Sequence, residues 1–160
     1  MEENSKKPVV MPPLGMYAAR VDDRGRVKLP VDFQQYFAEL GEARFFITSL
    51  DRTIAQIYPI SVWRQNEKFL AEFTDEPEIA DNVAFNAADL GGQAELDGQG
   101  RLLLPAELRK ELGIENSGVR LHVRDERVEV LSDAVYEERR QRAKAAGPTD
   151  VTRLRKAGLK

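Results

Sequence analysis

The sequence predicts an α+β protein that is rich in β-strands and built from two similar halves. A phrase at positions 21–30 returns at 96–105, 75 residues later, as an apolar residue, Asp, two variable residues, Gly, Arg, three mostly apolar residues and Pro. Each copy precedes a short segment with helical spacing of apolar residues, followed by two segments in which apolar and polar residues alternate. A period this long with only two copies indicates duplication of a half-domain, because a solenoid needs at least three units.

The repeated phrase has the chemistry of a turn between two strands. A first strand is expected at 17–21, and Asp22 and Gly25 follow it; Asp97 and Gly100 are their counterparts in the second copy. A carboxylate at this position accepts hydrogen bonds from the next backbone N–H groups, and glycine adopts positive φ at little cost. The strand resumes at the arginine and ends at the proline, whose missing N–H is harmless in the first turn of a helix.

A short helix is expected after each proline. In the first copy Phe33, Tyr36 and Phe37 share one helical face, which we interpret as core rather than as a surface for base stacking. Gly41 and Gly113 follow directly, as expected for a left-handed helix cap.

Further elements complete each half. Strands are expected at 44–48, 53–58, 119–123 and 127–131, with helices starting near Ser61 and Ser132. Trp63 is interpreted as core or subunit interface. We expect residues 145–150, which include Gly147 and Pro148, to break the last helix.

The predicted organisation is a disordered arm at 1–14, a first repeat at 15–73, a linker or connection with a possible strand at 74–92, a second repeat at 93–144 and a flexible basic tail at 145–160.

Composition limits the function classes. The chain has no cysteine, one histidine (His122) and a net charge of −3, so neither a metal site nor a cofactor is expected, and no nucleophile, acid and base are arranged for catalysis. We therefore expect a protein that is not an enzyme and has no small-molecule substrate.

No segment reaches the roughly 20 apolar residues of a membrane helix, and a cytoplasmic location is expected. Residues 137–160 carry +5 and the rest −8, so any DNA contact must use a local basic surface.

The two Asp-x-x-Gly-Arg phrases, each with proline four residues after the arginine, resemble the MraZ family. The resemblance covers roughly residues 15–140 and includes Trp63 and the segment 105–109. It implies two fused swapped-hairpin modules of the SpoVT-AbrB type, forming a duplicated, double-psi-like barrel with short helices. It also implies a nucleoid-associated, sequence-specific transcriptional regulator that binds promoter repeats in double-stranded DNA of the division and cell wall gene cluster. The partner besides DNA is the chain itself, in a ring-shaped homo-oligomer that is often an octamer.

The family's DNA-binding arginine corresponds to Arg26, with Arg24 in the basic position before it. In the second copy Arg101 matches Arg26, whereas Gln99 and Leu103 replace Arg24 and Lys28. The first copy is therefore expected to be the better DNA reader. Arg20, Arg24, Arg26 and Lys28 alternate across the hairpin and are expected to share a face.

Structural alternatives exist for each candidate. Arg26 and Arg101 can instead pair with Asp22 and Asp97 and lock the turns, and one guanidinium has enough donors for both roles. Arg24 and Lys28 can be the ordinary charges of an exposed edge strand. The basic stretch at 139–144 fits a solvated helix face, an auxiliary DNA contact or a docking segment for a protein. The rival function is an antitoxin-like interaction module of the same superfamily, although the basic tail offers few apolar anchors.

Overall fold

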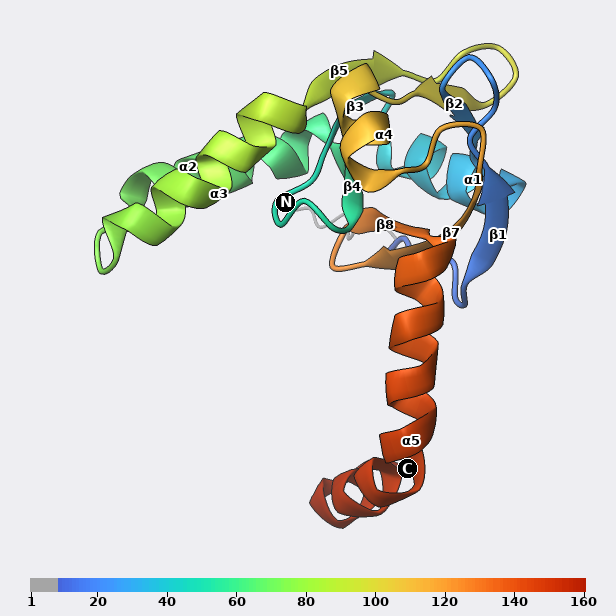
Figure 1. The fold of residues 1–160 in the computed structure, drawn as a ribbon, viewed down its shortest axis with the longest axis vertical. Helices are drawn as coiled ribbons and strands as arrows, with labels where there is room; N and C mark the ends of the chain where they lie inside the picture. The colour runs from blue at the N-terminus through green and yellow to red at the C-terminus, as the bar shows by residue number, and fades with distance from the viewer. Residues whose placement is uncertain (1–8) are drawn as a thin grey trace, which may run out of the picture.

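The computed structural model describes residues 9–160, which form two antiparallel sheets and five helices (Figure 1). The strands of the first half are β1 (Tyr17–Arg20), β2 (Arg26–Lys28), β3 (Arg44–Thr48) and β4 (Ala55–Pro59), and those of the second are β5 (Gly92–Glu95), β6 (Arg101–Leu103), β7 (Gly118–Arg124) and β8 (Arg127–Ser132). The helices are α1 (Val31–Leu40), α2 (Ile60–Glu72), α3 (Pro77–Leu90), α4 (Ala106–Leu112) and α5 (Asp133–Ala157). The predicted α+β class is confirmed. Most of the predicted disordered arm, residues 1–8, lies outside the described residues.

The two halves exchange strands. The six-stranded sheet has the order β1-β7-β8-β4-β3-β5, and β2 pairs with β6 in a separate two-stranded ribbon. Two pairings, β3 with β4 and β7 with β8, are hairpins within one half. The other four join one half to the other: β1 with β7, β2 with β6, β3 with β5 and β4 with β8. Neither half therefore has a complete sheet of its own.

The predicted closure into a barrel is not seen in the strand pairing of residues 9–160. β1 and β5 are the two edges of the larger sheet, and the ribbon β2–β6 is hydrogen-bonded as a separate sheet. The ribbon strands have three residues each, and a single bridge between Val21 and Val27 links the first turn's two sides. The ribbon covers the core by packing its apolar face, without extending the six-stranded ladder.

The core lies between the sheet, the ribbon and the two short helices, and both halves contribute equivalent residues to it. Six side chains related by the 75-residue offset are fully buried: Val27, Leu29 and Phe33, and Leu102, Leu104 and Leu108. Tyr36 and Phe37 are buried with them, which confirms the interpretation of the aromatic stripe as core. Both short helices end at glycines in the left-handed region, Gly41 at φ 73° and Gly113 at φ 65°, as predicted.

A second, smaller apolar cluster lies at the base of a helical arm, the hairpin of α2 and α3 that projects from the body (Figure 1). Trp63 is buried there and stacks on Phe46 with ring centroids 4.7 Å apart. The possible strand in the connection between the halves is not found within 77–90, because Pro77–Leu90 is a helix. Proline at its first turn suits a helix start, and Ala80, Ala87 and Leu90 are its buried side.

Helix α5 is longer than predicted. Ser132 caps its start by accepting a hydrogen bond from the Val135 N–H at 3.2 Å, and the helix continues through Pro148 to Ala157. The predicted break at 145–150 is wrong: the chain bends but stays helical (Figure 1), and a proline ring in an exposed helix is accommodated by such a bend. Nowhere in residues 9–160 is there a helix with the length and apolarity to cross a membrane.

Candidate nucleic-acid interface

The two Asp-x-x-Gly-Arg turns have the same hydrogen-bond pattern. Asp22 Oδ1 accepts from the backbone N–H groups of Arg24 and Arg26, both at 2.9 Å, and Asp22 Oδ2 accepts from Arg26 Nε at 3.1 Å. Asp97 Oδ1 accepts from the N–H groups of Gln99 at 2.8 Å and Arg101 at 3.0 Å. In each turn one carboxylate oxygen thus holds the backbone, and the other holds the arginine side chain.

The ion pair in the second turn is closer. Arg101 Nε lies 2.8 Å from Asp97 Oδ2, compared with 3.1 Å for Arg26 and Asp22. The structural alternative from the sequence, an arginine paired with the aspartate of its own turn, is therefore confirmed in both copies. In the described residues the Nη atoms of Arg26 and Arg101 donate to no protein acceptor, so each guanidinium keeps one edge for a ligand.

The hydrogen bonds lower the pKa of both turn carboxyls. For Asp97 the Arg101 backbone N–H is the main cause, with Gln99 and the Arg101 side chain adding to it, and the pKa falls to about 2. The pKa of Asp22 is also lowered, chiefly by the Arg26 backbone N–H. Each donor stabilises the charged carboxylate, so protonation must weaken the turn.

We expect the turns to contribute a pH-dependent part of the stability. A carboxyl with a lowered folded-state pKa stabilises the fold above its unfolded pKa, which is near 3.8 for Asp97, and loses that contribution as the pH falls toward about 2. Urea denaturation of wild type should therefore show stability falling between pH 4 and pH 2. Asp97→Asn, which keeps an oxygen acceptor but cannot be ionised, should show a smaller fall. If the free energy of unfolding fell equally with pH in the two proteins, this role for Asp97 would be contradicted.

The ribbon β2–β6 places three basic residues on one solvent-facing side. Its register pairs Arg26 with Leu103, Val27 with Leu102 and Lys28 with Arg101. Because side chains alternate along a strand and cross-strand partners share a face, Arg26, Lys28 and Arg101 lie on one side, with Leu103 beside them. Val27 and Leu102 are on the other side, fully buried in the core. The face is fixed by the register and by this burial.

Each turn is held against the opposite half by a backbone hydrogen bond and by a side chain from a short helix. Leu104 N donates to Gly25 O and Leu29 N donates to Gly100 O, both at 2.9 Å. The Arg109 guanidinium of α4 contacts Gly25 and donates to the Leu104 carbonyl, and the Gln34 amide of α1 contacts Gly100. Sequence reasoning missed these contacts, although the 75-residue offset that relates Pro30 to Pro105 also relates Gln34 to Arg109.

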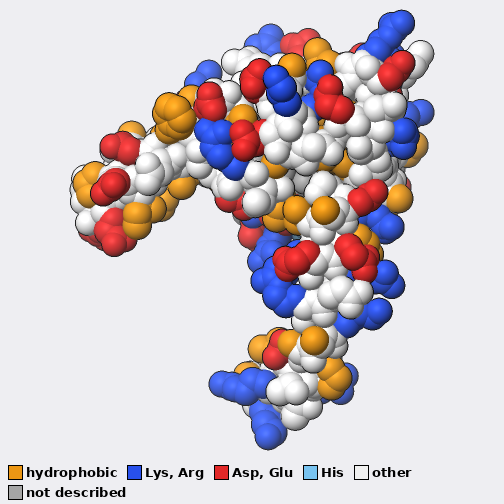
Figure 2. Space-filling model, in the orientation of Figure 1, with side chains coloured by type: hydrophobic (Ala, Val, Ile, Leu, Met, Phe, Trp, Pro, Cys, Tyr) orange, Lys and Arg blue, Asp and Glu red, His pale blue; other side chains and the backbone are white. Residues whose placement is uncertain are grey.

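The remaining predicted site residues are further from this face. Arg24 is exposed in the first turn, next to the ribbon. Arg20 lies on β1 in the larger sheet, and its Nη2 donates to Asn116, to the carbonyl at 2.8 Å and to Oδ1 at 3.0 Å. The structure thus brings Arg26, Lys28 and Arg101 together, adds Arg24 at the turn and ties Arg20 to another loop. Space-filling atoms of Lys and Arg protrude at the corner where the turns lie (Figure 2).

Fold and site together define a class: an internally duplicated α+β protein whose halves exchange strands and display paired arginine turns on a β-ribbon. Comparison with known proteins agrees. A family model described as "MraZ protein, putative antitoxin-like" matches residues 91–155. A protein of Desulfitobacterium hafniense strain Y51 named transcriptional regulator MraZ is 31% identical over 147 residues, which are 91% of this chain and 99% of that protein.

Two further relatives carry the same name. The one from Acidobacterium capsulatum is 38% identical over 96 residues, which are 60% of this chain and 66% of the relative, just under two thirds of its length. The one from Thermoanaerobacter sp. strain X514 is 34% identical over 127 residues, 78% of this chain and 84% of the relative. The chain belongs to the MraZ family.

Proposed function

We propose that this protein is a sequence-specific DNA-binding transcriptional regulator that reads short promoter repeats with the outer face of the β2–β6 ribbon. The observation that carries the proposal is the register that gathers Arg26, Lys28 and Arg101 on one exposed side. A two-stranded ribbon fits the major groove, where a guanidinium can pair with the O6 and N7 of guanine. The relatives' printed name, transcriptional regulator, supports the same function. As the resemblance implies, the target is the division and cell wall gene cluster.

Within this proposal the residues have different roles. Arg26 reads bases or phosphate through the edge of its guanidinium that Asp22 leaves unoccupied, and Arg24 and Lys28 contact phosphates. Arg101 contributes from the second turn. Arg20, held by Asn116, makes only a peripheral contact with the DNA. The turns are kept rigid by Asp22, Gly25, Asp97 and Gly100, so DNA binding costs little conformational entropy there.

The assembly is also part of the proposal. In this proposal the two halves are fused swapped hairpins of the SpoVT-AbrB type, which the strand pairs between the halves support, and copies associate into a ring, an octamer in the form that the resemblance implies. An acidic chain binds DNA weakly through one small basic face, whereas several faces on successive repeats gain avidity of about 10² to 10⁴. We place the regulator in the cytoplasm, at the nucleoid.

The test is fluorescence anisotropy with DNA that carries the direct repeats upstream of the protein's own gene, measured across a salt series. Wild type should bind saturably, and Arg26→Ala should lower the affinity for this DNA by about tenfold or more. Lys28→Ala should reduce the salt slope by about 0.9 for each phosphate that the protein no longer neutralises. Arg44→Ala is the matched control, because Arg44 is an exposed arginine on β3, outside the ribbon, and bonds Glu95.

Two outcomes would contradict the proposal. One is wild-type protein that does not bind the repeats at low salt while it remains folded and associated. The other is Arg44→Ala weakening the complex as much as a folded Arg26→Ala. The alternative, an antitoxin-like interaction module, is favoured only by the family model's description; it predicts a stable complex with a protein partner that survives Arg26→Ala.

A further inference from the structure

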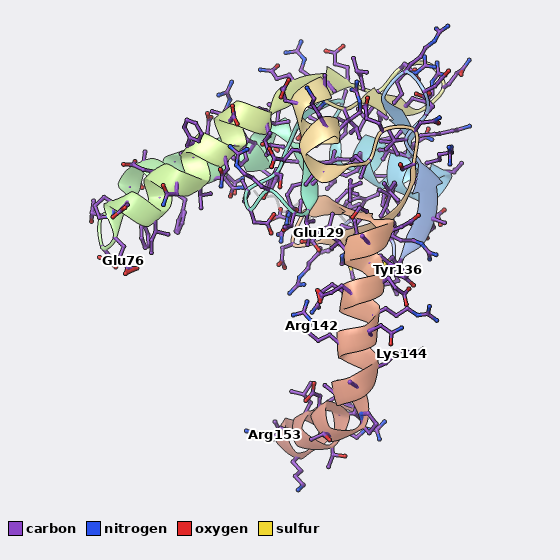
Figure 3. All side chains as sticks on the ribbon, in the orientation of Figure 1. Glu76, Glu129, Tyr136, Arg142, Lys144 and Arg153 are labelled. Atoms are coloured by element: carbon purple, nitrogen blue, oxygen red, sulfur yellow. The ribbon has the colours of Figure 1, made fainter. Side chains whose placement is uncertain are left out.

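Two elements project from the body and carry opposite charges. The segment from Phe69 to Leu90, most of the helical arm, has six acidic residues and no basic one, and residues 139–160 of the α5 region have eight basic residues and one acidic. Figure 2 shows red atoms gathered on the arm and blue atoms along α5. In Figure 3 Glu76 is at the tip of the arm, while Arg142, Lys144 and Arg153 follow one another down α5. The two surfaces are electrostatically complementary.

Both elements also expose apolar side chains. On the arm, Phe69, Ile79 and Phe85 are 62%, 52% and 65% exposed. Leu154 near the end of α5 and Leu159 just beyond it are 53% and 51% exposed, and no residue of α5 is buried. A surface that only binds phosphate has no need of large apolar groups, whereas protein interfaces combine an apolar centre with a charged rim. The apolar content therefore favours a protein as the occupant of both surfaces.

The arm has room for such an occupant. A groove of about 500 Å³ lies between the arm and the body, lined by Phe69, Phe73, Ile79 and Val83 of the arm and by Asp125, Glu126 and Arg127 of the β7–β8 hairpin. The hairpin thus adds two carboxylates and one arginine, and Arg127 lies 3.7 Å from Asp125. Within one chain α5 extends away from the arm (Figure 1), so a chain's own α5 does not fill the groove.

We propose that α5 of one copy docks on the helical arm of a second copy, with its basic side chains against the arm's carboxylates and Val151 and Leu154 against the arm's phenylalanines. This contact joins two different surfaces of the same chain, so it is head-to-tail and repeats from copy to copy until a ring closes. The inference rests on the self-association in the proposed function and names the surfaces that mediate it. It does not depend on DNA binding.

The charges available for the contact can be identified. Arg140 and Arg142 are paired within α5, with Glu137 at 3.7 Å and Glu138 at 3.1 Å. In residues 9–160, Lys144 and Arg153 form no ion pair, and Glu72 and Asp81 of the arm are exposed. These four residues are suited to a charge reversal, because changing them breaks no ion pair within the described chain.

The experiment is sedimentation velocity without DNA, at low and high salt. The arm variant is Glu72→Lys with Asp81→Lys, and the α5 variant is Lys144→Glu with Arg153→Glu. Each should associate about tenfold more weakly than wild type, because attraction becomes repulsion, and high salt should also dissociate wild type. The variant with all four changes should recover the wild-type association. The matched control, Glu39→Lys with Glu107→Lys on the exposed sides of α1 and α4, should associate normally.

Several results would overturn the proposal: wild type monomeric at all concentrations, either variant associating like wild type, or no recovery with all four changes. An α5 variant that forms assemblies of the same mass as wild type but loses affinity for DNA would show that α5 binds nucleic acid instead. Loss of DNA binding on Arg26→Ala is measured separately, so a failure of the docking proposal and a failure of the ribbon proposal are distinguishable.

Discussion

Replacing Phe33 by alanine is expected to lower the free energy of unfolding by about 3–5 kcal/mol, the usual range for a buried phenylalanine. Phe33 is fully buried in the core cluster, and its ring meets that of Tyr17 edge-on with centroids 4.9 Å apart. It affects the site indirectly, because the helix that carries it also carries Gln34, which contacts the second turn. Removing the ring therefore loosens the core directly beneath the ribbon.

Urea denaturation of the folded protein measures this change. Leu108→Ala, at the equivalent position of the second half and also fully buried, should cost about 2–5 kcal/mol. Val31→Ala is the control, since Val31 starts the same helix but is 62% exposed, and it should change the stability by about 0.5 kcal/mol at most. A Phe33→Ala effect as small as that of Val31→Ala would show that α1 does not seal the core.

Alanine at Gly25 or Gly100 is expected to destabilise the protein by about 2–5 kcal/mol, the sum of a backbone effect and a side-chain effect. Both glycines lie in the left-handed region, at φ 81° and 75°, where another residue is disfavoured by about 1–2 kcal/mol. A Cβ would also displace the Arg109 guanidinium at Gly25 and the Gln34 amide at Gly100. Each of these side chains donates a hydrogen bond to a backbone carbonyl of its own half, and breaking such a bond costs about 1–3 kcal/mol more.

Gly98→Ala provides the comparison, in the second turn beside Gly100. A Cβ there meets nothing within 4 Å, and Gly98 does not have a positive φ, so the expected change is within about 0.5 kcal/mol. In Gly25→Ala the clash should be partly relieved by Arg109→Ala, which gives a coupling energy in a double-mutant cycle. Equal effects of Gly25→Ala and Gly98→Ala would show that the contact with Arg109 does not hold the turn.

Local features of this fold were predictable from the sequence. The turn, the strand that follows it and the glycine caps depend on interactions within a few residues, so Asp22, Gly25 and Gly41 identified them. The ion pair between Asp22 and Arg26 was one of two alternatives, and the structure contains it. The duplicated phrase also located both halves of the core, because apolar residues at the same offset occupy equivalent buried positions.

Features that depend on the other half, or on tertiary context, were not predictable. Nothing within residues 96–105 specifies that Gln34 will contact Gly100, because that contact follows from strand exchange. Local signals also failed for two helices. From its local sequence Pro77 is expected in a linker, whereas it starts α3, and Pro148 is expected to break a helix, whereas α5 bends around it. A proline in the interior of a helix costs about 3 kcal/mol, a cost that lowers stability without excluding the helix.

The covalent link between two strand-exchanging halves has an evolutionary consequence. In a dimer of identical single repeats, a substitution in one turn is unavoidably made in both. Here the turns have diverged, since Gln99 and Leu103 stand where the first copy has Arg24 and Lys28, while the hydrogen bonds from the aspartate to the backbone of its turn are the same. One copy is therefore free to specialise in recognition while the other keeps the architecture that both need.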